Sequence, residues 1–388
     1  MDRSKWEYKK LGEVCIDFVV PQRDKPTAFD GDIPWCRIED IDGRYLNGSK
    51  SGQNVTRELA DKMNMHLCPK GTVISACSAS IGTQAITTTE CYTNQTFIGL
   101  VVNPDLLYNV YLYYYLESKS NMLQGLGQGA TIKYISKNKY QNMTIPLPSV
   151  EDQQRIVAEL DCLNEMIALK QEQLKEFDKL AQSIFYDMFG KQDFPQYPLK
   201  DVLSKMGSGA TPSGGNQSYK TEGISLIRSL NVHNNEFIYT DLAFIDDKQA
   251  RKLDNVIVEE NDVLLNITGA SVARCCIVPS NVLPARVNQH VSILRPNRKM
   301  VDSTYLCQLL ISKEEQTKLI VLSKSKAATR EALPKNILEK FLIKLPPLAL
   351  QQQFAEKIQA IEAQKELVKQ SIAETQQLLD SRMDYYFN

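Results

Sequence analysis

The segment IPLPSVEDQQRIV at residues 145–157 recurs as IKLPPLALQQQFA at residues 343–355, an offset of 198 residues without a gap. Both copies share an Ile-x-Leu-Pro start and a Gln-Gln pair that begins five residues after the proline. Because an internal repeat constrains the architecture more strongly than any single motif, this pair sets the frame for the rest of the chain.

The repeat extends upstream of both segments. The offset drifts by only seven residues over the whole match, so order and spacing are both kept. The matching positions are Ile33 and Arg37 with Ile224 and Arg228 (offset 191), Asn94-Gln95 with Asn288-Gln289 (offset 194), and Ala130-Thr131 with Ala328-Thr329 (offset 198). The chain therefore consists of globular regions at 1–150 and 191–342, each followed by a helical region, at 151–190 and 343–388.

Each globular region mixes strand and helix patterns. Short β-like runs occur at 73–74, 97–102, 263–267 and 291–294, between Gly, Pro, Asn and Asp residues. The stretches 108–116 and 305–311 read as amphipathic helices. We therefore predict an α+β fold for both regions.

The segments after each repeat carry a 4-3 hydrophobic seam over four heptads. A strict 3.5-residue period favours a coiled coil over a helix lying on a sheet. Two such seams in equal halves of one chain can pair antiparallel about a pseudo-twofold axis, which predicts that Phe387 lies near Trp6. The seam residues are Ile156, Leu160, Leu163, Ile167, Leu174, Phe177, Ile184, Phe354, Ile358, Ile361, Val368, Ile372 and Leu379.

A lysine interrupts each seam near mid-helix, Lys170 in the first and Lys365 in the second. We favour the interpretation that both side chains snorkel to solvent. The alternative is a polar device that fixes the register of the pair.

Composition excludes several classes of protein. No run of 18 apolar residues and no apolar stretch near the N-terminus is present, so neither a membrane span nor a secretory signal is expected. Nine cysteines without C-x-x-C spacing suggest reduced thiols in a cytoplasm. The net charge of −1 hides an asymmetry, because the two globular regions total +5 and the two helical regions −6.

Catalytic and metal-binding patterns are missing. There is no phosphate-binding G-x-x-x-x-G-K-[ST] loop, no G-x-S-x-G nucleophile elbow, and no set of ligands at metal spacing around the three histidines. We therefore expect no catalytic residues and no metal site in this chain.

The positive signals are those of nucleic-acid binding. A lysine-rich loop lies between residues 118 and 149 and recurs at 318–335 in the second copy. Its side chains could reach successive phosphates. Arg, Lys, Asn and Gln side chains could read base edges. The candidates are Gln22, Arg23, Arg37, Arg44, Lys133, Lys137, Lys139, Arg228, Asn231, Arg274, Arg286, Lys324, Lys326, Arg330 and Lys335. The shared Asn-Gln pairs are better explained as structural caps or turns.

The paired motifs, the Gly209-Ala-Thr-Pro-Ser213 turn and the IPWCRIEDI and ISLIRSLNV strands resemble the specificity subunit of type I restriction–modification systems over essentially the whole chain. The resemblance implies two target recognition domains that each read one half of a split double-stranded DNA sequence. It also implies antiparallel helices that dock two methyltransferase subunits, with restriction subunits in the full complex. S-adenosylmethionine, ATP and Mg²⁺ would then belong to the partners, and this chain would hold no cofactor.

Two alternatives remain: a specificity module of a fused restriction–methylation enzyme, and a coiled-coil scaffold whose globular regions bind protein. The salt dependence of binding distinguishes a DNA-binding protein from a protein-binding scaffold. We predict that affinity for DNA falls steeply as salt rises, with a log–log slope set by the number of phosphates contacted. A binding constant that barely responds to salt in a titration would favour an apolar protein interface.

Overall fold

The computed structural model describes residues 3–21, 24–126, 134–212 and 214–324, together with 331–388. It divides into two compact units, Met1–Gln171 with Lys369–Asn388, and Glu172–Val368. Within the described residues, no helix has the length and apolar character needed to cross a membrane.

Unit 1 is built on a six-stranded sheet in the order β2-β10-β7-β8-β5-β4, with a three-stranded sheet β6-β3-β9 and a ribbon β1-β11. The strands are β1 (Glu7–Lys10), β2 (Cys15–Val19), β3 (Ile33–Cys36), β4 (Ile41–Asp42), β5 (Tyr45–Leu46), β6 (Asn54–Val55), β7 (Val73–Ala76), β8 (Gln84–Thr87), β9 (Tyr92–Thr93), β10 (Phe97–Val102) and β11 (Thr144–Leu147). The helices are α1 (Leu11–Val14), α2 (Arg57–Lys62), α3 (Asn109–Ser118), α4 (Ser120–Leu126) and α5 (Lys137–Gln141).

Unit 2 has two four-stranded sheets, β13-β22-β19-β20 and β17-β14-β21-β18, with the ribbons β15-β16 and β12-β23. The strands are β12 (Gln196–Pro198), β13 (Leu203–Ser208), β14 (Ile224–Ile227), β15 (Val232–His233), β16 (Glu236–Phe237), β17 (Ala243–Ile245), β18 (Ile257–Val258), β19 (Val263–Asn266), β20 (Cys275–Ile277), β21 (Ala285–Val287), β22 (Val291–Pro296) and β23 (Leu342–Lys344). The helices are α7 (Leu199–Val202), α8 (Asp247–Arg251), α9 (Ser303–Ile311), α10 (Lys313–Ser323) and α11 (Lys335–Leu338).

The two units repeat one topology. The strand series β2-β10-β7-β8 in unit 1 corresponds to β13-β22-β19-β20 in unit 2, and the ribbon β1-β11 corresponds to β12-β23. The aligned strands β3 and β14 begin at Ile33 and Ile224, the residues that the sequence alignment pairs. The predicted α+β repeat is therefore confirmed.

The helices α3 and α9 are not amphipathic, contrary to the prediction. Val110–Leu116 is buried at every position, because α3 lies in a core shared by the sheet and the long helix that follows. The tyrosine hydroxyls are satisfied inside this core, as when Tyr111 Oη donates to the carbonyl of Pro146 at 2.9 Å. In α9, Tyr305 Oη donates equivalently to the carbonyl of Lys344 at 2.8 Å. A buried tyrosine needs such a partner, so these hydroxyls do not indicate a solvent face.

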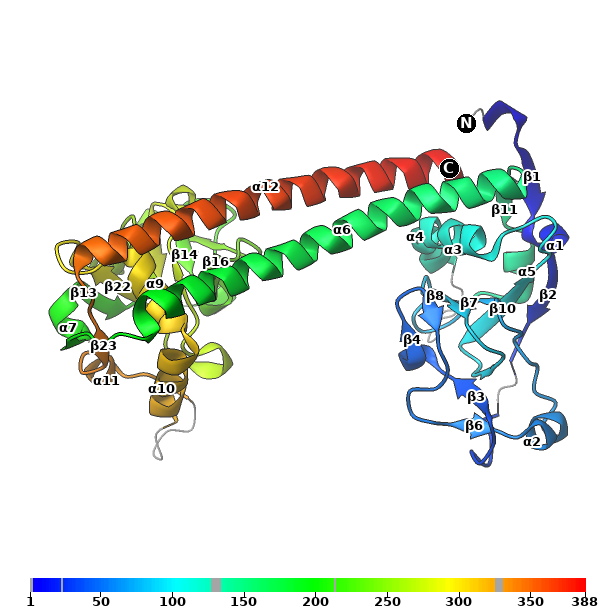
Figure 1. Cartoon of the computed structure of the whole chain (residues 1–388), viewed down its shortest axis with the longest axis horizontal. Helices are drawn as coiled ribbons and strands as arrows, with labels where there is room; N and C mark the ends of the chain where they lie inside the picture. The colour runs from blue at the N-terminus through cyan, green and yellow to red at the C-terminus, as the bar shows by residue number, and fades with distance from the viewer. Residues whose placement is uncertain (1–2, 22–23, 127–133, 213, 325–330) are drawn as a thin grey trace. The chain divides into compact units, whose positions relative to one another are not determined.

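The long helices α6 (Val150–Phe185) and α12 (Leu348–Phe387) pair antiparallel within each unit (Figure 1). In unit 1, Glu159 pairs with Arg382 at 2.9 Å, and farther along α6, Lys170 Nζ donates to Ser371 Oγ at 2.6 Å. As numbers rise on α6, partner numbers fall on α12. The same order holds in unit 2, from the Asp178–Lys365 pair to the contact of Phe185 with Phe354.

All of the predicted seam residues are at least partly buried. Eight of the predicted seam residues are buried and five are half-buried. The buried ones are Ile156, Leu160, Leu163, Ile167, Phe354, Ile358, Ile361 and Leu379, and the half-buried ones are Leu174, Phe177, Ile184, Val368 and Ile372.

The lysines in the seam do not simply snorkel to solvent, so the favoured interpretation is wrong. The side chain of Lys365 is only 11% exposed, and its ammonium binds Asp178 on the facing helix at 2.9 Å and Glu362 at 3.0 Å. Lys170 donates across the pair to the hydroxyls of Ser371 and Thr375, at 2.6 and 3.0 Å. Both lysines therefore bind across the seam at one particular register.

Each unit is completed by the end of the helix from the other half of the chain. Phe387 packs on Tyr111 in unit 1, with ring centroids 5.1 Å apart, and Phe189 packs on Tyr305 in unit 2 at 4.9 Å. Trp6 stacks on Tyr386 at 6.3 Å, which confirms that the end of the chain returns to its start.

A buried glutamine joins the start of each long helix to its globular region. Gln153 Oε1 accepts from the N–H of Tyr108 at 2.8 Å, and its Nε2 donates to the carbonyls of Leu106 and Pro148, both at 2.9 Å. Gln351 makes the equivalent three bonds with Asp302, Met300 and Pro346. Both side chains are fully buried, which explains why the repeat keeps a glutamine five residues after the proline.

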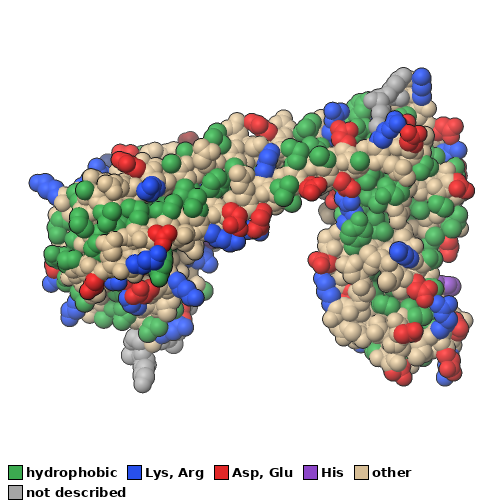
Figure 2. Space-filling model, viewed as in Figure 1, with side chains coloured by type: hydrophobic (Ala, Val, Ile, Leu, Met, Phe, Trp, Pro, Cys, Tyr) green, Lys and Arg blue, Asp and Glu red, His purple; other side chains and the backbone are tan. Residues whose placement is uncertain are grey.

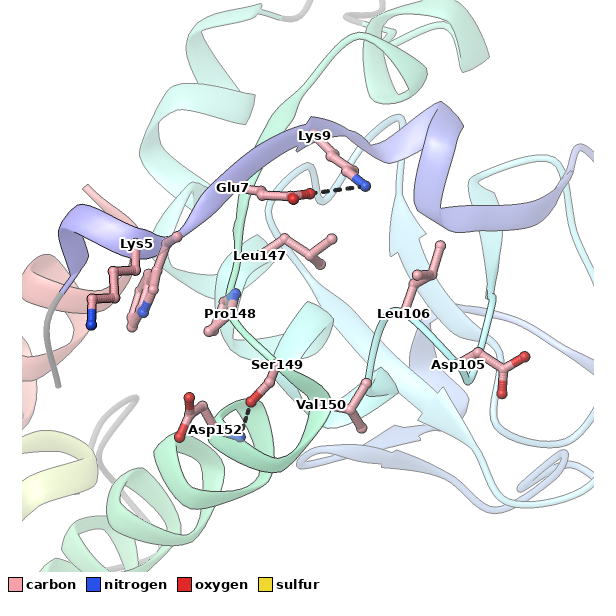
Figure 3. A pocket seen from close by; sticks show the side chains of 11 residues that line it. Lys5, Glu7, Lys9, Asp105, Leu106, Leu147, Pro148, Ser149, Val150 and Asp152 are labelled. Carbon is pink, nitrogen blue, oxygen red and sulfur yellow. Dashed lines mark hydrogen bonds and ion pairs between the residues drawn. The ribbon is translucent and has the colours of Figure 1, made fainter.

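The first turn of α6 is shown in Figure 3, where Ser149 Oγ accepts from the N–H of Asp152 at 3.2 Å. Strand β1 passes beside it and carries the Glu7–Lys9 ion pair. Together these segments line a cavity of about 600 Å³ at the junction of the ribbon and the helix.

We predict that Gln153→Ala lowers the free energy of unfolding of unit 1 by about 2–4 kcal/mol, because it strands one buried N–H and two buried carbonyls. Denaturant titration followed by tryptophan fluorescence reports on this unit, which holds both tryptophans, Trp6 and Trp35. The matched control, the exposed Gln154→Ala, should change little. An unchanged midpoint for Gln153→Ala would show that the three hydrogen bonds of Gln153 contribute nothing to stability.

We predict that replacing both Lys170 and Lys365 with leucine scrambles the pairing, because an apolar seam no longer distinguishes one register from the next. Hydrogen exchange over 163–181 and 361–379 should then show two populations. The control is the same replacement at the exposed Lys175 and Lys357. A single population that exchanges more slowly would mean that the lysines only cost stability.

Candidate nucleic-acid interface

Four chain segments meet at one junction in each unit. In unit 1, the N–H of Asn94 donates to the carbonyl of Cys36, and the N–H of Ile135, just after the lysine-rich loop, donates to the carbonyl of Cys77. An isolated bridge pairs Ser78 with Tyr134. The N–H of Cys77 also donates to the carbonyl of Thr96, so the end of β3, the Asn-Gln turn, the residues after β7 and the end of the lysine-rich loop are brought together.

Unit 2 builds the same junction from different residues. The N–H of Asn288 donates to the carbonyl of Ile227, that of Leu333 donates to the carbonyl of Ile267, and a bridge pairs Thr268 with Ala332. Two regions of dissimilar sequence therefore present their variable side chains from one shared backbone frame.

The shared asparagines are structural caps. Asn94 Oδ1 accepts from the N–H and the hydroxyl of Thr96, and Asn288 Oδ1 accepts from the N–H of His290 at 2.9 Å. Gln95 and Gln289, which follow them, are exposed at the turn. Sequence reasoning grouped each Asn-Gln pair as one feature, but only its first residue serves the fold in this way.

Arg37 and Arg228 stand at equivalent positions beside this turn. The backbone N–H of each is held by a side chain three residues on, Asp40 Oδ2 at 2.7 Å and Asn231 Oδ1 at 3.0 Å. Arg37 lies over the ring of Trp35, and Arg228 lies 5.2 Å from the ring centroid of Tyr219. The frame therefore fixes the backbone of both arginines, while the aromatic support comes from a different place in each unit.

The partners of the two guanidinium groups also differ. Arg37 pairs with Glu39 at 2.9 Å, whereas Arg228 donates to the carbonyl of Asp241. Arg228 also borders a hollow of about 380 Å³ with Tyr219, Lys220 and the exposed Leu230. Sequence reasoning missed Tyr219 and Lys220, because they precede β14 in a stretch without a repeat partner.

Three predicted candidates are held inside their own units. Asn231 is fully buried, and its amide donates to the carbonyl of Ile238 at 2.9 Å. Arg286 is 8% exposed and pairs with Asp254 at 2.9 Å. The guanidinium of Arg44 pairs with Asp161 on α6. These side chains serve the fold.

The remaining described candidates lie at or near the surface. Lys335 is exposed, 3.8 Å from Glu339, and Lys324 lies 3.9 Å from Glu331. Arg274 is half-buried beside His233, at 3.4 Å. Exposed ion pairs of this kind contribute little to stability, so their cations can exchange a carboxylate for a phosphate at small cost.

In unit 1, Lys137 Nζ donates to the carbonyl of Phe18 at 3.1 Å, and Lys139 lies half-buried on the same short helix, α5. The predicted residues Gln22, Arg23, Lys133, Lys326 and Arg330 lie outside the described residues.

The cavity at the start of α6 is a weaker candidate for DNA. Its charged lining is Lys5 and Lys9 against Glu7, Asp105 and Asp152. Three carboxylates against two ammonium groups do not attract a polyanion. Within the described residues, no cluster of His, Cys, Asp and Glu side chains suits a metal ion. The duplicated junction is therefore the candidate interface.

Comparison with known proteins identifies a family and several relatives. A family model described as the type I restriction modification DNA specificity domain matches residues 3–178 and again 191–377. The MjaIX specificity subunit of Methanocaldococcus jannaschii is 30% identical over 190 residues, which cover 47% of this chain and 44% of that protein. The MjaVIII specificity subunit of the same organism is 21% identical over 295 residues, covering 69% and 67%. The matched part is thus under half of the first relative and about two thirds of the second.

Solved structures share the fold. The type I restriction–modification S subunit of M. genitalium superposes with a TM-score of 0.55 at 13% identity, covering 99% of this chain and 96% of that one. A chain from a structural study of complex assembly and conformational transition in the type I system superposes with a TM-score of 0.64 at 20% identity, covering 99% and 97%.

Proposed function

We propose a function from the family of this chain, which belongs to the type I restriction–modification specificity proteins. The chain recognises a bipartite, asymmetric DNA sequence for a methyltransferase and endonuclease complex. The observation that supports this proposal best is the duplicated junction, in which the same backbone arrangement presents different side chains in the two units. Equal frames can meet the phosphates of a duplex equivalently, while unequal side chains such as those around Arg37 and Arg228 select different bases.

We infer that the chain itself is not an enzyme. Its relatives are named as specificity subunits. In this proposal the methyltransferase subunits would bind S-adenosylmethionine, and the restriction subunits would use ATP and Mg²⁺. The contribution of this chain is to choose the site and to hold the partners there.

The long helices are the proposed docking surface for two methyltransferase subunits. Leu169 and Leu367 are 64% and 59% exposed, and Leu180 and Leu378 are both 46% exposed. Each pair is separated by 198 residues, the offset of the repeat. Hydrophobic side chains interrupt the charged surface along the helical segments in Figure 2.

Within each unit, these leucines fall on the flank of the helices that lies away from that unit's own globular region. Counted from the seam, they occupy heptad positions c and g, whereas Asp161 and Glu362, which contact the globular regions, occupy b and e on the other flank. An apolar stripe that is duplicated with the chain suits two copies of one partner better than one copy of each of two partners. This supports docking of two equivalent subunits.

The function is tested by expressing the chain with the methyltransferase subunit of its own system and mapping modified adenines by sequencing. We predict a single split motif with two different halves and a fixed spacer. Modification without a split motif, or at every adenine in a simple short word, would contradict the proposal.

We also predict that the helices set the spacer. One heptad inserted into α6, with the matching heptad in α12, adds about 10.5 Å, which corresponds to about 3 base pairs at about 3.4 Å each. Adenine mapping should show unchanged half-sites and a longer spacer. An active variant with the original spacer would show that the helices do not act as the ruler.

A further inference from the structure

The β4–β5 hairpin reaches from the globular region of unit 1 to the long helix α6. Arg44, on the turn of this hairpin, donates through Nη2 to Asp161 Oδ1 at 2.5 Å and to the hydroxyl of Tyr114 at 2.5 Å. Tyr114 Oη also donates to Asp161, and Asn164 Nδ2 donates to Tyr114 Oη at 3.1 Å. The hairpin, the buried helix α3 and the long helix therefore share one polar cluster.

The cluster is tight for a charged group. Arg44 lies 4.8 Å from the ring centroid of Tyr114, and its side chain is 20% exposed. Burial by itself lowers the pKa of Arg44, but the hydrogen bond to Asp161 and the nearby negative groups raise it overall, so the guanidinium stays charged. A charge-assisted, partly desolvated pair of this kind is stronger than an exposed ion pair.

Unit 2 has a contact at the equivalent place. Asn235 is the second turn residue of the β15–β16 hairpin, as Arg44 is in the β4–β5 hairpin, and the two positions are 191 residues apart. Asn235 Nδ2 donates to Glu362 Oε1 on α12 at 3.2 Å, and Glu362 also binds Lys365. This contact is a single bond from a neutral amide, weaker than that of Arg44.

Each globular region is thus attached to its helix by two polar contacts, in addition to the apolar core that region and helix share. In unit 1 the buried Gln153 holds the start of α6, and Asp161 lies eight residues farther on, about 12 Å along the axis. Apolar packing is not directional, so the shared core does not by itself fix the angle between the region and the helix. A second attachment along the helix fixes the tilt.

We propose that Arg44 and Asp161 are positioning residues that fix the tilt of the first globular region on the helix pair, and that this tilt sets how strictly the complex discriminates between DNA spacers of different length. The inference rests on the proposed function and deepens it. The helices give the mean distance, and the hairpin contacts limit deviation from it. The weaker contact of Asn235 makes the second region the more permissive of the two.

The test uses the full chain assembled with its methyltransferase subunit, after the motif of the unaltered complex has been mapped. Plasmids carry that motif with its own spacer or with one base pair more or less, and the methylation rate is measured on each. We expect Asp161→Asn and Arg44→Ala each to raise the methylation rate on the altered spacers, relative to the original spacer, by about tenfold. A tenfold loss of discrimination is typical of losing one charge-assisted hydrogen bond.

Two features separate positioning from other roles. The double variant should behave like either single one, since both remove the same ion pair. Discrimination within each half-site should stay unchanged. The matched control is Arg57→Ala, which removes the exposed ion pair of Arg57 with Glu90 in the same unit and should alter nothing.

Two outcomes would contradict the positioning role, and a third would contradict the proposed function on which it rests. If Asp161→Asn, on the half-exposed face of α6, folds and keeps the original spacer selectivity, the positioning role is wrong even if Arg44→Ala fails to fold. If Arg44→Ala lowers methylation equally on all spacers and Asp161→Asn does not, Arg44 contacts DNA and the positioning role is again wrong. If the unaltered complex yields no split motif, the proposed function itself fails.

Discussion

The apolar seams of α6 and α12 leave water by packing against each other and against the globular region, and this happens once in each unit. Each unit contains one end of the helix that belongs to the other half of the chain, so Phe387 completes the core around Tyr111 and Phe189 completes the core around Tyr305. Neither half of the chain holds all of its own core. The antiparallel pair is therefore a condition for folding as well as a connection between domains.

The features that hold the helices are duplicated, and the side chains around the two arginines of the candidate interface are not. Gln153 and Gln351 make the same three bonds, and Asn94 and Asn288 cap the same turn. Around this constant frame the side chains differ, as in the supports of Arg37 and Arg228. A frame that is constant and a surface that varies are what two readers of unlike half-sites require.

The sequence was sufficient for the repeat, the α+β class and the antiparallel helices, because periodicity and offset are properties of order along the chain. It was insufficient for the environment of single polar residues. Arg44 looks like a free cation in the sequence, since its partner Asp161 lies 117 positions away. Lys365 looks like a snorkelling side chain, since its buried contact with Asp178 depends on the register of the pair. The stretch 108–116 looks amphipathic in the sequence, but the hydroxyls of Tyr111 and Tyr115 donate to backbone carbonyls and that of Tyr114 donates to Asp161.

The central claim, that two independent readers share one spacing device, is tested most directly by exchanging residues 191–342 for the matching region of another member of the family and mapping the methylated adenines. The account predicts a new sequence in one half of the motif, with the other half and the spacer unchanged. A change in both halves, or a changed spacer, would contradict it.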